Sequence, residues 1–192
     1  MGYPSGVQAP RVRVIPAALA AVALAAALAS AVGGCSSGGP ATDGPLGGGA
    51  FGSISGGEDC VTRFISQLQT FGDERFTNHG HTTVVLDRVA LLHPHNERLV
   101  GSYAVPGTLL IGTVPWPPKY AGMPPAWKDR QPVHGFRLAP GKSFNMVLGV
   151  AAAGPGRAAS QGMVIYYHDS AGSYVTSNHL AMIIAATKTG CN

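Results

Sequence analysis

The sequence predicts an all-β fold, an immunoglobulin-like sandwich of two sheets and about seven strands, within residues 58–192. Short runs of β-branched and aromatic residues alternate there with Pro, Gly, Asn and Asp, as in strands joined by turns. The clearest unit is a hairpin in which the turn 169–172 joins a strand at 163–168 to one at 173–187. With 45% hydrophobic and 11% charged residues, the 192-residue chain is too apolar to be disordered throughout.

The remaining strands follow from the same punctuation. They are expected at 82–92, 98–105, 108–114, 135–138 and 143–153. The run 61–71 stays open between a short helix and an irregular first strand, because its apolar residues fit a helical stripe better than they fit strand alternation.

Residues 1–34 have the layout of a secretory signal peptide. Arg11 and Arg13 precede an apolar run at 14–32 that is rich in Ala and Leu. A membrane-spanning helix is the alternative, but the run is at the short end of what crosses about 30 Å of hydrocarbon. We therefore expect this segment to direct export and to be removed.

The run closes with Val32-Gly33-Gly34-Cys35, which resembles the lipobox of bacterial lipoproteins. The resemblance implies cleavage before Cys35, a diacylglycerol on its sulfur and acylation of its new amino group. Several acyl chains would anchor the protein firmly at the extracytoplasmic face of the cell membrane. Residues 35–57 would then comprise the lipidated cysteine and a flexible linker, because this Gly/Pro/Ser-rich stretch has hardly any large apolar side chain.

Cys60 and Cys191 bracket the expected domain, 58–192. Outside the cytoplasm, two such thiols are expected to form a disulfide. A metal role is the alternative, but no Cys-x-x-Cys spacing or neighbouring Cys/His pair supports it.

The charge of the chain excludes nucleic acid as an implied partner. The formal net charge is +4, and loss of Arg11 and Arg13 with the signal peptide leaves +2. The remaining basic residues are scattered along the sequence and do not form a cluster within it.

Four segments resemble parts of small secreted immunoglobulin-like sandwiches in uncharacterised actinobacterial lipoproteins. They are FTNHG at 76–80, RLVG at 98–101, WPP at 116–118 and LAPGK at 138–142. The resemblance covers most of residues 60–191. It implies a fold and a location, and it carries over no catalytic residue.

Histidine pairs are the first candidate site. His79-x-His81 and His93-x-His95 each have the spacing that presents two imidazoles on one strand face to Zn²⁺ or Cu²⁺. The pairs flank the expected strand 82–92 at opposite ends, so one site built from both is not expected. The favoured interpretation places each pair in a polar turn, and an extracytoplasmic metal-binding module is kept as the alternative function.

The Pro-rich segment 115–127 holds both tryptophans of the chain and should run as polyproline II and turns. Trp116, Tyr120 and Trp127 could grip an envelope protein or stack on a glycan. The favoured interpretation folds the segment back so that at least one ring, with Trp116 preferred, caps an open end of the sandwich.

No pattern predicts catalysis or a cofactor. The chain lacks a Gly-x-Ser-x-Gly elbow, and no carboxylate pair suggests glycoside hydrolysis. We therefore expect a membrane-anchored lipoprotein whose non-catalytic β-sandwich binds or scaffolds a cell-envelope protein or glycan.

Overall fold

The computed structural model describes residues 40–50, 57–62, 68–107, 111–119 and 123–191. These residues form thirteen strands in three sheets and two short 3-10 helices, which confirms the all-β class. The expected number of about seven strands is therefore too low. No helix in the described ranges is long and apolar enough to cross a membrane. The expected signal peptide and Cys35 lie outside them.

The largest sheet has six strands. In spatial order they are β1 (Leu46–Ala50), β3 (Leu68–Asn78), β9 (Ser143–Ala152), β5 (Glu97–Pro106) and β7 (Gln131–Pro132), with β6 (Ile111–Pro115) also pairing β3. All its pairs are antiparallel.

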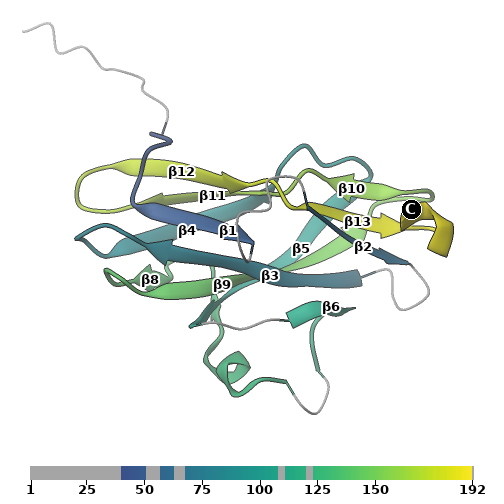
Figure 1. The fold of residues 1–192 in the computed structure, drawn as a ribbon, viewed down its shortest axis with the longest axis horizontal. Helices are drawn as coiled ribbons and strands as arrows, with labels where there is room; N and C mark the ends of the chain where they lie inside the picture. The colour runs from purple at the N-terminus through teal and green to yellow at the C-terminus, as the bar shows by residue number, and fades with distance from the viewer. Residues whose placement is uncertain (1–39, 51–56, 63–67, 108–110, 120–122, 192) are drawn as a thin grey trace, which may run out of the picture. The chain divides into compact units, whose positions relative to one another are not determined.

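Two smaller sheets complete the fold. The four-stranded sheet has the order β12 (Ser173–Asn178), β11 (Met163–His168), β4 (Val84–Leu91) and β8 (Arg137–Leu138). The three-stranded sheet has the order β10 (Ala158–Ser160), β13 (Ala181–Ala185) and β2 (Glu58–Thr62), with β13 and β2 parallel. Figure 1 shows the four-stranded sheet towards one end of the domain and the three-stranded sheet towards the other.

One hydrophobic core joins the three sheets. Phe76 and Phe144 of the six-stranded sheet stack with ring centroids 5.6 Å apart. The core also takes Ile165 from the four-stranded sheet and Ile184 from the three-stranded sheet, both fully buried. Inward-facing residues alternate along β11, as expected for a strand with one buried face.

The expected strand 173–187 is two strands, β12 and β13, in different sheets. Asn178 ends β12 because its side chain turns inward, where its Oδ1 accepts a hydrogen bond from the Met163 amide at 2.9 Å. The run 61–71, left open above between a short helix and an irregular first strand, is assigned in part. Val61 lies in β2 and Phe71 in β3, both buried in the core, while 63–67 lie outside the described residues.

Residues 40–50, assigned above to the flexible linker, are packed into the fold, and we call them the N-terminal arm. The Ala41 amide donates to the Ser173 carbonyl at 3.1 Å, and the Val175 amide donates to the Ala41 carbonyl at 2.8 Å. Farther along, β1 pairs with β3 from the Leu46↔Asn78 register onward. The arm therefore connects edge strand β12 to the six-stranded sheet.

The arm binds mainly through its backbone, which is why its composition suggested a linker. Gly44 lies against the Tyr167 hydroxyl and the ring of Tyr174, where a β-carbon would be 2.6 Å from Tyr174. Leu46 is the apolar anchor, 2% exposed, and its amide donates to the Tyr167 hydroxyl at 3.1 Å. A single leucine and a row of backbone hydrogen bonds thus hold the segment.

The expected disulfide is present between Cys60 of β2 and Cys191 of the C-terminal 3-10 helix η2 (Lys188–Cys191). The cysteines are 131 residues apart in sequence, so the bond closes a loop that contains nearly the whole domain.

We expect reduction of this disulfide to lower the melting temperature by well over about 5 °C, because the gain in loop entropy stabilises the unfolded chain by about 4–5 kcal/mol. Calorimetry with and without reductant measures it; an unchanged melting temperature would contradict the prediction.

Candidate functional site

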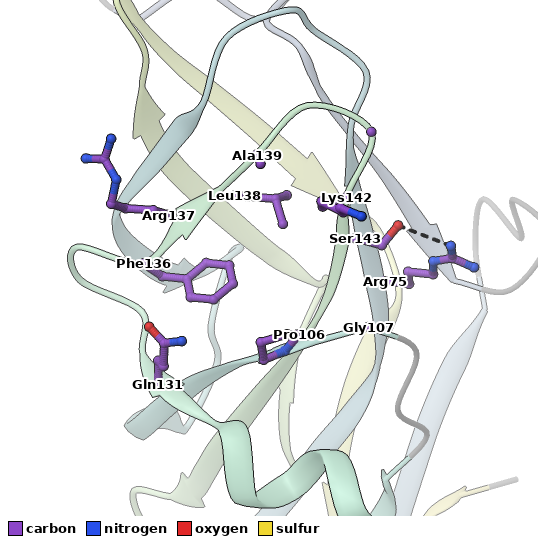
Figure 2. A pocket seen from close by; sticks show the side chains of 11 residues that line it. Arg75, Pro106, Gly107, Gln131, Phe136, Arg137, Leu138, Ala139, Lys142 and Ser143 are labelled. Atoms are coloured by element: carbon purple, nitrogen blue, oxygen red, sulfur yellow. Dashed lines mark hydrogen bonds between the residues drawn. The ribbon is translucent and has the colours of Figure 1, made fainter.

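A cleft of about 460 Å³ lies between the turn that precedes β9 and the ends of β5 and β8 (Figure 2). Three cations, Arg75, Arg137 and Lys142, are among its lining residues, and no Asp or Glu is. Phe136, Leu138 and Pro106 supply apolar lining. We call this the cationic cleft. It combines an apolar floor with a positively charged rim.

Asn78 fixes the turn that carries Lys142. Its backbone carbonyl accepts from the Gly141 amide at 2.8 Å, and its amide donates to the Lys142 carbonyl at 3.0 Å. Its buried side chain donates to the Leu138 carbonyl at 3.0 Å and to the Thr82 carbonyl at 2.8 Å. The Lys142 backbone is therefore held in place while its side chain stays exposed to solvent.

Arg75 is held on the outer face of the six-stranded sheet. One terminal nitrogen of its guanidinium donates to Ser143 Oγ at 3.1 Å (Figure 2), and Ser143 Oγ is 2.8 Å from Thr77 Oγ1. Within the described part of the chain, none of the three cleft cations forms an ion pair. Charges of one sign without compensation attract an anion, and a guanidinium matches carboxylate or phosphate geometry.

A second cleft, also about 460 Å³, shares Arg137 with the first and is lined by His168, Asp169 and Ser170. His168 Nδ1 lies 2.8 Å from Asp87 Oδ1, so its pairing partner is on the neighbouring strand β4. Asp169 accepts from Thr82 Oγ1 at 2.7 Å and from two amides of its own turn, and these bonds lower the pKa of Asp169. Asp169, the acidic residue of this cleft, thus stabilises the β11–β12 turn by accepting hydrogen bonds from its amides.

The histidine pairs lie in the connections that follow two strands, where His95 forms an isolated β-bridge with Ala159. His79 and His81 follow β3, and His93 and His95 follow β4, so the two pairs are not brought together. All four side chains are exposed. Within the described residues, no group of three or more His, Cys, Asp and Glu side chains is placed to hold a metal ion.

The tryptophans pack on the outer face of the six-stranded sheet, which corrects the expectation that they cap an open end. Trp116 stacks on Tyr103 at 5.5 Å between ring centroids, and Trp127 meets the same ring edge-on at 5.6 Å. Trp116 lies over Gly101 and Gly149, which face each other across β5 and β9. These glycines leave room for the indole where any side chain would displace it.

Trp127 is the more buried of the two rings, 8% exposed, although Trp116 was preferred from the sequence. It sits in the 3-10 helix η1 (Pro125–Asp129), which folds the Pro-rich segment back over the sheet. As a result β9 is buried on both faces, and its sequence reads as a nearly continuous apolar run. Tyr120 lies outside the described residues.

Among the residues whose burial the structure describes, two carboxyl groups are buried, and sequence reasoning did not find them. Burial raises the pKa of Glu97 to about 7, against a smaller lowering by the Ser160 hydroxyl. Burial also raises the pKa of Glu74, where a hydrogen bond from Asn178 opposes it and Asp59 adds to it. Both glutamates lie in strands of the six-stranded sheet, β3 and β5.

Comparison with known proteins places the chain in no family. No family description matches it, and no curated protein does. Among solved structures, the VesB protease of Vibrio cholerae is similar over 73% of this chain at 10% identity with a TM-score of 0.34; the chain spans 32% of VesB. A PapD-like domain of human CEP192 is similar over 74% of this chain and 85% of that domain, at 10% identity and a TM-score of 0.33. Both similarities are distant.

The buried Glu97 predicts a pH-dependent stability. The folded state keeps a proton that the unfolded state releases above about pH 4.5, so stability is full below that pH and falls as the pH rises through about 7. In the wild type this change should lower the free energy of unfolding by about 3 kcal/mol, and Glu97→Gln should abolish that decrease. Urea unfolding between pH 4 and about 8 measures it. Glu58→Gln, at an exposed carboxyl of β2, is the control. Parallel pH profiles for Glu97→Gln and wild type would refute the prediction.

The packing of Trp127 predicts a large effect of its truncation. Trp127→Ala should lower the free energy of unfolding by about 3–5 kcal/mol, because a buried ring is lost from the sheet face. Lys128→Ala, at the exposed neighbour in the same 3-10 helix, should change it by less than about 0.5 kcal/mol. Chemical denaturation measures both, and equal effects of the two substitutions would show that the ring does not hold the segment.

Proposed function

We propose that the protein is a lipoprotein, anchored through Cys35 at the extracytoplasmic face of the membrane, whose immunoglobulin-like domain binds an anionic envelope component without catalysing a reaction. The lipobox-like Val32-Gly33-Gly34-Cys35 supports the anchor. The observation that carries the binding role is the cationic cleft, where Arg75, Arg137 and Lys142 line one hollow without a carboxylate among its lining residues.

The cleft suits a phosphate or carboxylate group, which envelope proteins, glycans and lipids can all carry. Arg75 offers a guanidinium beside the Ser143 hydroxyl, and Lys142 offers a mobile point charge on a fixed backbone. Hydrogen bonds to charged groups contribute about 1.5–3 kcal/mol each, so two or three give useful affinity at a shallow site. The apolar floor at Phe136 and Leu138 would take up the uncharged part of such a ligand.

A polyanion titration tests the binding role. Inorganic polyphosphate should bind the wild-type chain in a salt-dependent way, and Lys142→Gln with Arg137→Gln should weaken binding by at least about tenfold, since charge-assisted contacts are lost. Arg98→Gln with Arg157→Gln removes two exposed cations outside the cleft and is the matched control. Calorimetry gives the affinities. Equal losses in the two double variants, or no binding by wild type, would contradict the proposal.

A further inference from the structure

We propose that one end of the domain rests against the anionic phospholipid of the membrane that holds Cys35, with Lys142 and Arg137 at the headgroups. We call it the arm end: the turns 79–83, 139–142 and 169–172, together with Ala41. The inference rests on the proposed lipid anchor and extends it, because it assigns an orientation and names the phosphate of a membrane lipid as the anion of the cationic cleft.

Hydrogen bonds bring these segments to the same end. Ala41 bonds to Ser173 and Val175 at the start of β12, beside the 169–172 turn. The His79 amide donates to the Pro45 carbonyl at 2.9 Å, which joins the arm to the turn after β3. Figure 1 shows the β11–β12 turn and β8 at one end of the domain and the C-terminus at the other.

The length of the arm limits how far the domain can stand from the membrane. If residues 36–57 were all free, the linker would have a root-mean-square reach of about 25 Å and would leave the orientation open. Because Ala41 is already fixed to β12, only five residues separate it from Cys35. An extended chain covers at most about 3.6 Å per residue, so Ala41 stays within about 20 Å of the anchor.

Lys142 and Arg137 are the groups of the arm end that would contact lipid phosphates. Lys142 and Arg137 are exposed there, and electrostatic attraction to an anionic surface acts within about 10 Å. Three acids lie at or beside this end, and one of them, Asp87, pairs with His168 just before the 169–172 turn. The Asp169 carboxylate already accepts three hydrogen bonds from Thr82, Ala171 and Gly172, and Asp43 is exposed in the arm.

Photocrosslinking from the two ends of one strand tests the orientation. Ser170 and Gln161 are exposed in turns at opposite ends of β11, so Ser170→p-benzoylphenylalanine and Gln161→p-benzoylphenylalanine form a matched pair in the full chain. After reconstitution into vesicles of phosphatidylcholine and phosphatidylglycerol, irradiation should attach phospholipid to position 170 at least about fivefold more than to position 161. Mass spectrometry of the protein reports the adducts. Equal or reversed yields overturn the inference.

Two further measurements separate the anchor from the orientation. Incorporation of radiolabelled palmitate, lost in Cys35→Ala, reports the anchor independently, so an anchored protein without the position-170 adduct contradicts only the orientation. A protein that takes up no palmitate contradicts both the anchor and the orientation. Lys142→Glu with Arg137→Glu should lower the position-170 yield at least about threefold, relative to Arg98→Glu with Arg157→Glu. An unchanged yield would contradict the headgroup assignment and give the cleft to a soluble anion.

Discussion

The structure depends on the backbone hydrogen bonds through which the N-terminal arm joins two sheets. Ala41 pairs with β12 of the four-stranded sheet, and β1 pairs with β3 of the six-stranded sheet, so the arm covers the edge between them. Between these two pairings, the Leu46 side chain packs into the core and the Leu46 amide donates a hydrogen bond to the Tyr167 hydroxyl. Covering this edge also satisfies backbone groups that would otherwise lie unpaired at a sheet margin.

The same end of the domain holds the candidate site because Asn78 links the arm to the cleft. Its register partner is Leu46 in β1, and its backbone and side chain hold the turn that carries Lys142. A buried amide with all these bonds made stabilises one arrangement of the loops. The arm, the Lys142 turn and the cationic rim are therefore parts of one hydrogen-bonded unit. A substitution in the arm should accordingly alter the arrangement of the cleft.

The sequence predicted the strands best where apolar and turn residues alternate. The hairpin strand β11 and the long strand β9 lie close to their expected ranges, and Cys60 and Cys191 pair as expected. It failed where backbone or distant contacts decide the structure. The glycines of the arm suggested a linker because their hydrogen bonds carry no side-chain signal, and the cationic cleft draws Arg75 and Lys142 from positions far apart in the sequence. Gly101 and Gly149 were the sequence signal for the packing of Trp116, since a glycine inside a strand marks a place where another group approaches the backbone closely.

Amide hydrogen exchange in the full chain tests the central claim, that residues 40–50 belong to the fold. The amides of Ala41 and Leu46 donate to Ser173 and to Tyr167, so they should exchange at least about 1000-fold more slowly than in an unstructured peptide. Their protection should be lost together with that of β3 as denaturant is added. Exchange of both amides at peptide rates, while β9 stays protected, would show that the arm is a free linker and would remove the basis for the arm-end orientation.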